Sequence, residues 1–366
     1  MRILILCFWA HGNCYYTAKF ANALSEVPET EVHLVIPENF LFDLLSSRVH
    51  IRKLPFSASA KIGLKALLKT FAQIWKTCLI IRTLRPEWIH ILWLHHVPAV
   101  TGRCFTRSRI AYTAHDPVLH SGESGRLRTL INRCLIQKSN VCFTHGNANV
   151  LIYKHSFPKG PPAVSIPHGE FGFWEKTENV VQEKMILFFG RIRPYKGLAV
   201  LLDAFDNTSA GDPDLRLCIC GEGSIDSYRA RISRMSHIEI INRFIGHGEI
   251  PHLFGRSLFV CLPYLEATQS GVIPMAFALG RTCIATNAGA LTDVAIHQYN
   301  SLIVPPGDVP ALSNAMSFLL YNDRERKRME KNALLSARTA DSLSWKKAAA
   351  TVIETYRTID MTPLER

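Results

Sequence analysis

Short apolar runs alternate along the whole chain with longer segments of helical periodicity. In the first half, the apolar runs cover 3–9, 32–36, 89–94, 109–115 and 141–145, and the helical patterns cover 17–26 and 61–83. In the second half, the apolar runs cover 185–190, 215–221, 238–244, 258–264, 283–287 and 301–306, and the helical patterns cover 197–206, 272–280 and 342–358. This alternation is typical of βαβ units, which build parallel sheets. The pattern therefore predicts an α/β protein.

The alternation occurs as two series, and each series predicts a Rossmann-like domain. The chain has 366 residues, of which 48% are hydrophobic and 20% charged, and this composition excludes a disordered chain or a coiled coil. The segment FPKGPP and the Gly- and Glu-rich stretch after it have the composition of an exposed linker. We predict an N-terminal domain over 1–170 and a C-terminal domain over 171–345. A last helix within 346–366 packs on either domain, with packing back on the N-terminal domain as one option.

The N-terminus and the cysteines indicate the cellular compartment of the protein. The opening run MRILILCFWAHG has the length of a signal-peptide core but no small-residue cleavage site, so it is interpreted as a buried strand. No stretch reaches the roughly 18–20 apolar residues of a membrane span. The 10 cysteines form no C-x-x-C pair, and several lie inside apolar runs. Free thiols in the cytoplasm are therefore favoured over disulfides or a zinc site.

The net charge of +12 is concentrated in the first half of the chain. Residues 1–170 contain 20 lysines and arginines against 9 acidic residues, whereas residues 171–366 contain 22 against 21. Such an excess favours an anionic partner such as phosphate, nucleic acid or acidic lipid. No nucleic acid is expected, because no recognition motif or interleaving of aromatic and basic residues accompanies the charge.

The most concentrated basic feature is the predicted helix over 61–82, which lies in a stretch without acidic residues between Asp43 and Glu87. The lysines that share one side of this helix are Lys61, Lys65, Lys69 and Lys76. Apolar residues, Trp75 among them, occupy a broad opposite arc, a pattern typical of an interfacial membrane helix. The alternative is a surface helix whose apolar arc packs on the sheet. We expect peripheral association with the anionic inner face of the plasma membrane.

The segment F-G-R-I-R-P-Y-K-G, residues 189–197, is the most informative motif. It directly follows an apolar run and directly precedes a helical pattern. Arg191 and Lys196 are therefore expected at the carboxyl edge of a sheet beside a helix N-terminus, where open α/β sheets bind anions. The motif predicts a diphosphate site, and a solvated basic turn is the equally weighted alternative.

A second loop with polar residues follows the apolar run at 258–264. Thr268, Gln269 and Ser270 supply hydroxyl, amide and backbone donors at the start of the predicted helix over 272–280. This loop predicts a second part of the same anion site. The simpler interpretation is that Ser270 only caps the helix, and the two roles are compatible.

Four motifs together resemble those of glycosyltransferase family 4 and its bacterial polysaccharide relatives. They are G-R-I-R-P-Y-K-G, P-Y-x-x-A-T-Q-S-G-V, A-T-N-A-G-x-L-T-D-V and L-I-V-P-P-G-D. The resemblance is strong over about 185–320 and weaker in the N-terminal half. It implies the GT-B fold, with two Rossmann-like domains facing across a cleft and a nucleotide sugar held mainly by the C-terminal domain.

The resemblance also assigns donor-side residues. Arg191 and Lys196 match the pair that neutralises the donor diphosphate. The remaining matched donor positions are Gly221 and Glu222 in the nucleotide-side turn, and Phe244 and Ile245 in the segment beside the base. Many family members carry two glutamates with seven residues between them. Here Glu266 lies near the first position, but Pro274 or Met275 occupies the second, and the loop from Thr268 to Gly271 is the expected substitute.

Acceptor-side candidates lie in the N-terminal half. Gly12 follows the first apolar run, where a glycine turn lets a donor phosphate approach closely, although an ordinary turn is the more frequent reason for such a residue. His115 and Asp116 end another apolar run and resemble a segment that the family places beside the transferring sugar. The imidazole would hydrogen-bond a sugar hydroxyl, and the carboxylate would accept the proton of the acceptor. An exposed strand end followed by an ordinary turn is the structural alternative.

The resemblance implies a retaining glycosyltransferase that uses a UDP- or GDP-sugar in bacterial exopolysaccharide or lipopolysaccharide synthesis, and the basic N-terminal half favours a lipid-linked saccharide as the acceptor. No metal cofactor is expected, because the two cations would replace the usual Mg²⁺ or Mn²⁺. The alternative is a catalytically inactive nucleotide-sugar-binding subunit of a polysaccharide assembly complex, which the absent second glutamate supports. A GT-B epimerase is less favoured, because its catalytic carboxylates are not recognisable.

Overall fold

A computed structural model of the chain describes residues 1–8, 13–40, 44–54, 64–101, 108–120, 125–172 and 180–361. These residues form two compact units. The first comprises the described parts of Met1–Leu119, Ser124–Gly169 and Trp345–Arg366, and the second comprises His120 and the described parts of Glu170–Ser344. Among the helices in this part of the chain, none combines the length and the apolarity needed to cross a bilayer.

The first unit contains a seven-stranded sheet in which all neighbouring strands are parallel. Its strands are β1 (Arg2–Leu6), β2 (Glu31–Pro37), β3 (Val49–Leu54), β4 (Trp88–Ile91), β5 (Arg109–Thr113), β6 (Val141–His145) and β7 (Ala163–Ile166). They lie in the order β3-β2-β1-β4-β5-β6-β7. The chain therefore builds outward in one direction from β1 and then in the other direction from β4, as in a doubly wound fold.

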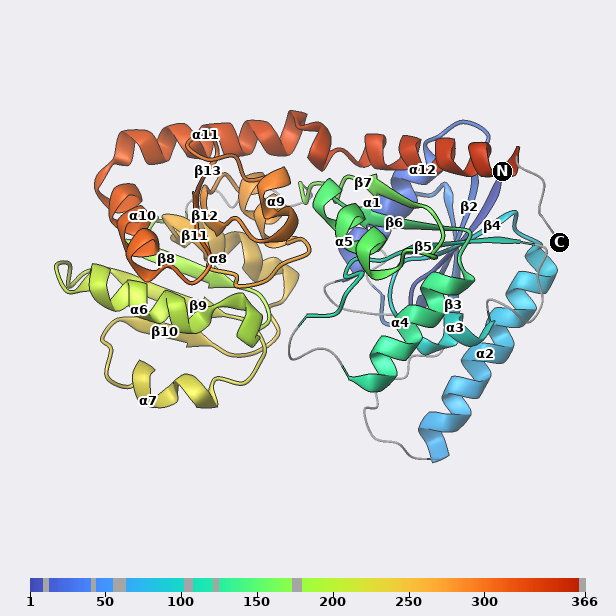
Figure 1. Cartoon of the computed structure of the whole chain (residues 1–366), viewed down its shortest axis with the longest axis horizontal. Helices are drawn as coiled ribbons and strands as arrows, with labels where there is room; N and C mark the ends of the chain where they lie inside the picture. Colours follow the sequence, from blue (N-terminus) through green and yellow to red (C-terminus); the bar gives the residue numbers. More distant parts are fainter. Residues whose placement is uncertain are drawn as a thin grey trace. The chain divides into compact units, whose positions relative to one another are not determined.

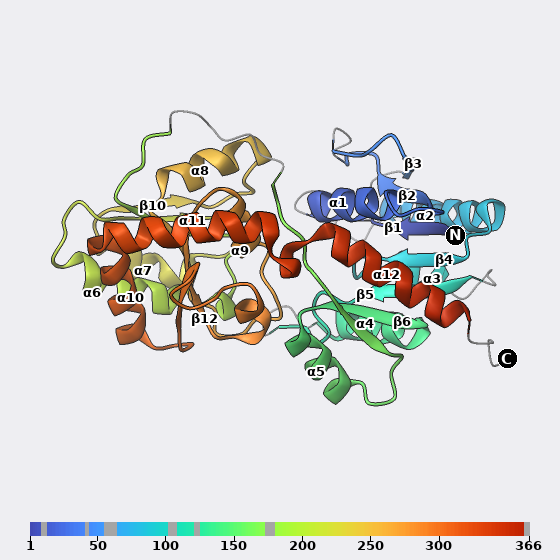
Figure 2. The same ribbon diagram turned by 90° about the horizontal axis from the view of Figure 1, so that it is seen from above.

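Helices cover both faces of this sheet. One face packs against α1 (Asn13–Ser25) and α12 (Trp345–Asp360), which run side by side (Figure 2). The other face packs against α2 (Leu64–Leu84), α3 (His96–Thr101), α4 (Arg126–Lys138) and α5 (Asn147–Ser156). The C-terminal helix joins the first unit through Tyr356, whose ring stacks on Trp88 with 3.9 Å between centroids. The Tyr356 hydroxyl also forms a 2.6 Å hydrogen bond with Nδ1 of His90.

The second unit contains a six-stranded parallel sheet in the order β10-β9-β8-β11-β12-β13 (Figure 1). Its strands are β8 (Met185–Phe189), β9 (Arg216–Cys220), β10 (Ile238–Ile241), β11 (Phe259–Leu262), β12 (Cys283–Thr286) and β13 (Ser301–Val304). One face packs against α6 (Leu198–Ser209) and α10 (Val309–Tyr321), and the other packs against α8 (Ile250–Arg256), α9 (Val272–Ala278) and α11 (Asp323–Thr339). A short helix, α7 (Arg229–Ile232), lies between β9 and β10.

The predicted α/β architecture with two parallel sheets is confirmed. Strands β3 and β7 and helices α3, α4, α5, α7, α8, α10 and α11 are additional elements that the apolar pattern did not predict. The middle four residues of β3 are exposed, because β3 is an edge strand. An edge strand of this kind carries no continuous apolar run, and its sequence therefore resembles that of a loop.

Candidate active site

The candidate donor site lies at the carboxyl edge of the second unit's sheet. Strands β8 and β11 are neighbours there, although α6, β9, α7, β10 and α8 lie between them in sequence. Open α/β sheets bind ligands at such a switch point, outside the carboxyl ends of the strands. The loops at 190–197 and 263–271, which contain the two motifs singled out in the sequence, leave the sheet at this point.

Two glycines allow three loops to meet at this edge. Gly221 has a φ of +138°, and a Cβ atom on it would lie 2.1 Å from the carbonyl oxygen of Gly190. Gly197 has a φ of +70°, and a Cβ atom on it would lie 1.9 Å from the carbonyl oxygen of Pro263. Any side chain at either position would separate the loops. The backbone of Glu222, whose side chain is exposed, accepts a 2.9 Å hydrogen bond from the Ile192 N–H and joins two of them.

Lys196 places a buried ammonium group at the switch point. Lys196 is only 9% exposed, and its Nζ donates a 2.6 Å hydrogen bond to the Tyr264 hydroxyl. Nζ also lies 4.1 Å from the centroid of the Tyr264 ring. A Cβ atom on Gly190 would lie 3.6 Å from Nζ, so the ammonium group sits directly over the turn that leaves β8.

Tyr264 connects this ammonium group to the polar loop before α9. Its hydroxyl lies 3.4 Å from Oγ of Ser270, which accepts a 3.2 Å hydrogen bond from the Val272 N–H. Burial raises the pKa of the Tyr264 hydroxyl well above its usual value, and the Ser270 contact and the charge of Arg191 oppose this rise. The hydroxyl therefore stays neutral. Arg191 is exposed and lies close enough to Tyr264 to act on it electrostatically.

The sequence interpretation did not include Tyr264. Tyr264 lies just after the end of β11, near the start of the second motif, P-Y-L-E-A-T-Q-S-G. A tyrosine at the end of a buried strand, beside two loops that contain Lys196 and Ser270, is the signal that could have identified it.

His120 and its contacts hold the loop at 263–271. One of its ring nitrogens, Nε2, lies 3.1 Å from Oγ1 of Thr268, and its ring stacks on Tyr195 with 4.5 Å between centroids. Its Nδ1 lies 3.8 Å from a carboxylate oxygen of Glu266, whose side chain is 54% exposed. Within the described residues, the side-chain oxygen of Gln269 is buried and has no hydrogen-bond partner. This oxygen is available to a donor group of a ligand.

The position of the second family glutamate carries no carboxylate. Pro274 and Met275 lie in α9, with Gly271 immediately before the first residue of that helix. Pro274 is buried and Met275 is partly buried. A ligand at this end of α9 would therefore meet backbone groups and the Ser270 hydroxyl rather than a second charge.

The loop after β10 is held by an ion pair and exposes one aromatic ring. The guanidinium of Arg243 donates two hydrogen bonds, of 2.8 and 2.6 Å, to the Glu249 carboxylate, which also accepts a 2.9 Å bond from the Gly246 N–H. The hydrogen bonds from Arg243 lower the pKa of Glu249 to about 2. Phe244 is 44% exposed, whereas Ile245 is buried. The loop therefore presents the Phe244 ring as a flat surface on which a base can stack.

One carboxylate pair with the D-x-D spacing of metal-dependent glycosyltransferases lies elsewhere. Asp212 and Asp214 precede β9, at the amino edge of the sheet. The Asp212 carboxylate is paired with the Lys184 ammonium and accepts a 3.1 Å hydrogen bond from the Tyr321 hydroxyl. Asp212 therefore has a structural role at the edge opposite to that of the motif loops.

In the first unit, His115 lies in a cluster of aromatic rings at the carboxyl edge of the sheet. Its ring stacks on Trp93 with 3.8 Å between centroids and meets Tyr16 edge-on at 4.8 Å. Burial, together with the nearby rings of His145 and His168, holds the pKa of His115 well below its usual value. The imidazole is therefore neutral, and it can donate or accept a hydrogen bond but cannot serve as a standing positive charge.

Asp116 follows His115 and is partly buried. Its negative charge acts electrostatically on Tyr112 and His145, which places the carboxylate near the ends of β5 and β6. Gly12 lies outside the described residues.

Helix α2 exposes part of the apolar arc that the alternative interpretation expected to pack on the sheet. Within this arc, Leu68 is 62%, Phe71 72% and Trp75 61% exposed, whereas Ile74 is partly buried against the core. The side of α2 that packs on the sheet instead carries Gln73, Thr77, Ile81 and Leu84. The alternative of a packed arc therefore holds for Ile74 but not for Leu68, Phe71 and Trp75.

The basic residues of the same helix are also exposed where they are described. Lys69 and Lys76 lie on the exposed surface beside Trp75. Lys61 and the side chain of Lys65 lie outside the described part of the chain.

The sequence and the fold both have known relatives. Residues 183–322 match the family model for Glycosyl transferases group 1. The phosphatidyl-myo-inositol mannosyltransferase of Mycobacterium leprae is 28% identical over 179 residues, which cover 48% of this chain and 47% of that protein. The D-inositol 3-phosphate glycosyltransferase of Corynebacterium glutamicum is 30% identical over 183 residues, which cover 47% of this chain and 43% of that protein. The chain thus spans about half the length of the curated relatives it matches.

Solved structures match over nearly the whole chain. The sucrose-phosphate synthase of Thermosynechococcus elongatus has a TM-score of 0.74 at 16% identity and covers 99% of each chain. Anabaena HepE in complex with UDP-glucose has a TM-score of 0.74 at 16% identity and covers 97% of this chain and 100% of that one. At these identities the structural likeness establishes the fold. The chain therefore has the GT-B fold, and its residues 183–322 are similar to the Glycosyl transferases group 1 family.

Proposed function

We propose that the protein is a retaining, metal-independent glycosyltransferase that moves a sugar from a UDP- or GDP-sugar to a lipid-linked saccharide in bacterial surface polysaccharide synthesis. The observation that carries this proposal is the buried Lys196 ammonium at the switch point between β8 and β11. Two relatives support it. The HepE structure holds UDP-glucose, and the mycobacterial relative is named for mannose transfer and for phosphatidyl-myo-inositol, a membrane lipid. The resemblance to family 4 supports retention.

The proposed transfer depends on stabilising the negative charge of the leaving group. As the bond between the anomeric carbon and the donor's phosphate oxygen breaks, negative charge grows on the leaving diphosphate. Lys196 and Arg191 stabilise this charge, and one such preorganised donor contributes about 10²–10³ in rate. Because these cations supply the positive charge, the transfer needs no divalent metal.

On the acceptor side, we assign roles to His115 and Asp116. The acceptor hydroxyl oxygen bonds to the anomeric carbon on the face that the diphosphate leaves, and its proton passes to the Asp116 carboxylate. The neutral His115 imidazole hydrogen-bonds a hydroxyl of the sugar. The aromatic rings of Trp93 and Tyr16 fix the orientation of His115.

The test measures the release of UDP and GDP from a panel of nucleotide sugars in the presence of a bacterial lipid extract. Lys196→Ala is expected to lower the rate at least 100-fold. The control variant is Lys331→Ala, an exposed lysine on α11, which keeps the wild-type rate. Adding Mg²⁺ or Mn²⁺ to the metal-free protein is expected to leave the rate unchanged. Donor binding without turnover by the wild-type protein would contradict the proposal and would favour an inactive binding subunit.

We propose further that the first unit binds an anionic membrane surface through α2 and α4. On α4, Leu127 is 70% and Leu130 63% exposed. The exposed arginines beside them are Arg126, Arg128 and Arg133. Neither helix contains an acidic residue, and α3 contacts both of them. Exposed leucines and aromatic rings among cations suit an anionic bilayer, where each cation near the surface contributes about 1 kcal/mol.

Vesicle flotation tests the membrane proposal. The wild-type chain is expected to float with vesicles that contain phosphatidylglycerol and to remain in solution with pure phosphatidylcholine. The double variant Phe71→Ser/Trp75→Ser is expected to lose at least 90% of the bound fraction, as roughly estimated from the apolar area that it removes from the interface. The control is Leu335→Ser, because Leu335 on α11 is 48% exposed. Binding that does not depend on anionic lipid, or self-association through α2 instead, would contradict the proposal.

A further inference from the structure

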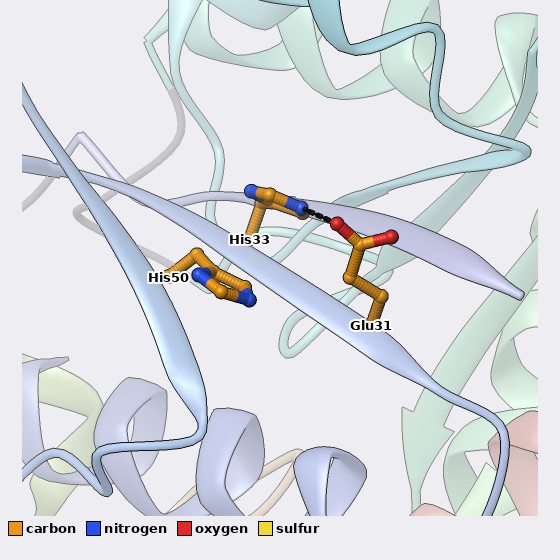
Figure 3. Close-up of side chains that lie close together, drawn as sticks. All are labelled: Glu31, His33 and His50. Atoms are coloured by element: carbon orange, nitrogen blue, oxygen red, sulfur yellow. Dashed lines mark hydrogen bonds and ion pairs between the residues drawn. The ribbon is translucent and has the colours of Figure 1, made fainter.

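Three side chains with metal-binding atoms lie together on the sheet of the first unit (Figure 3). Strands β2 and β3 pair in parallel, with His33 directly opposite His50. Glu31 lies two residues before His33 and therefore points to the same face of the sheet. Each residue offers one potential ligand atom, and these three atoms all lie within 4.8 Å of one another. The cluster uses none of the residues assigned to sugar transfer.

The positions of Glu31 and His33 already resemble those of two ligands that share an ion. His33 Nε2 lies 2.8 Å from one carboxylate oxygen of Glu31. Arg2 donates a 2.9 Å hydrogen bond to the other oxygen and holds the carboxylate in this orientation. The His50 ring stacks against His33, with centroids 4.7 Å apart and planes inclined at 22°. A metal ion that replaces the hydrogen bond between Glu31 and His33 would therefore have His50 beside it as a third ligand.

The His33 ring can present a nitrogen to a metal, and His50 can be reached from solvent. Among the described residues, none forms a hydrogen bond with the buried Nδ1 of His33, so no contact at that atom prevents the ring proton from moving to it. Nε2 can then present its lone pair to a metal. His50 is exposed, which gives an ion access from solvent.

We infer that Glu31, His33 and His50 bind a divalent transition-metal ion such as Zn²⁺, with water completing the coordination. Two imidazoles and one carboxylate suit Zn²⁺, Ni²⁺ or Cu²⁺. Mg²⁺ and Ca²⁺ depend on several oxygen ligands and on negative charge. The charges of Arg2 and Arg52 beside the cluster disfavour them further.

The expected effect of the ion is to fix the edge of the sheet. Strand β3 is the edge strand, and its middle four residues are exposed. A metal bridge from His50 to His33 and Glu31 joins β3 to β2, the strand with which it pairs. The ion therefore stabilises the strand that precedes α2 in the chain, and it takes no part in the transfer step.

Calorimetric titration of Zn²⁺ into the untagged, metal-stripped full chain tests this site. The wild-type protein is expected to bind one Zn²⁺ ion in a step that His50→Gln weakens at least tenfold. Glu31→Gln is expected to weaken the same step. The matched control is His155→Gln on α5, which removes an exposed histidine outside the cluster and leaves the affinity unchanged. Mg²⁺ is expected to give no binding heat. Circular dichroism checks that the variants remain folded, which the exposure of His50 favours.

Equal Zn²⁺ affinity in the wild-type protein and in His50→Gln would assign the ion to other histidines or cysteines and overturn the inference. The absence of Zn²⁺ binding to the wild-type protein would also overturn it. Zn²⁺ is further expected to raise the melting temperature of the wild-type protein but not that of His50→Gln. Nucleotide binding measured on the same samples stays unchanged, so failure of this site is distinguishable from failure of the proposed transferase activity.

Discussion

At the scale of single residues, the donor site depends on how Lys196 is held. Its hydrogen bond to Tyr264 goes to a neutral hydroxyl, which orients the ammonium group without neutralising its charge. A carboxylate in that position would consume the charge that a diphosphate requires. The motif could predict Lys196, because a lysine between a strand and a helix has an evident role. It could not predict the contact with Tyr264, since the two residues meet only when β8 and β11 become neighbours.

Tyr264→Phe tests this positioning role, because the variant keeps the ring and removes the hydroxyl. We expect turnover to fall about tenfold, because the buried ammonium loses the group that orients it. Loss of this hydrogen bond is expected to lower the free energy of unfolding by about 1–2 kcal/mol. Steady-state kinetics and urea unfolding measure the two effects. Wild-type turnover in a folded variant would show that Lys196 is positioned without Tyr264.

The buried histidines of the first unit predict a pH dependence of stability. Burial lowers the pKa of His145 to about 3 and that of His168 to about 4, below the usual value of 6.5. Below pH 6.5 the unfolded chain therefore binds more protons than the folded chain, and stability falls as the pH decreases toward these values. Each histidine contributes about 1.4 kcal/mol per pH unit in this window.

Urea unfolding at pH 7.5 and pH 5, followed by tryptophan fluorescence, measures this effect. We expect His145→Gln to reduce the loss of stability between the two pH values, because glutamine does not titrate. His155→Gln serves as the comparison, since that histidine is exposed. An identical loss in all three proteins would contradict the assigned role of the buried ring.

At the scale of elements, the buried parallel strands were predictable and the surface elements were not. Strands β8, β9 and β11 are almost entirely buried and form continuous apolar runs. Helix α4 has seven polar and six apolar residues, and the apolar pattern did not reveal it. For α2, periodicity predicted the helix but not its buried side, which includes Gln73 and Thr77. The side of a helix that packs depends on its neighbours in the fold, and local sequence does not contain that information.

The turn after β9 allows a prediction at this scale. Gly221→Ala is expected to lower the free energy of unfolding by at least about 2 kcal/mol, because it combines a positive φ with a clash against the Gly190 carbonyl. Gly211→Ala is the matched control, since its Cβ atom would have no neighbour within 4 Å. Urea unfolding monitored by circular dichroism compares the two variants. Equal stability of both would show that the loops can separate at no cost.

At the scale of the whole molecule, the two units have different chemistry. The second unit carries the family motifs and the proposed donor site, whereas the first unit carries most of the excess positive charge. The sequence predicted both features, because motifs and charge are local properties. It left open where the last helix packs, and α12 belongs to the first unit through Tyr356 and Trp88. The contact joins residues far apart in the chain, which no local pattern could indicate.

The most direct test of the central claim is calorimetric binding of UDP and GDP to the wild-type protein, to Lys196→Ala and to Lys331→Ala. We predict that Lys196→Ala binds the preferred diphosphate at least tenfold more weakly, because the phosphates lose a buried positive charge. Binding of the corresponding nucleoside without phosphates is expected to remain unchanged, and Lys331→Ala is expected to behave as wild type. Equal affinity of Lys196→Ala and the wild-type protein for the diphosphate would contradict the account.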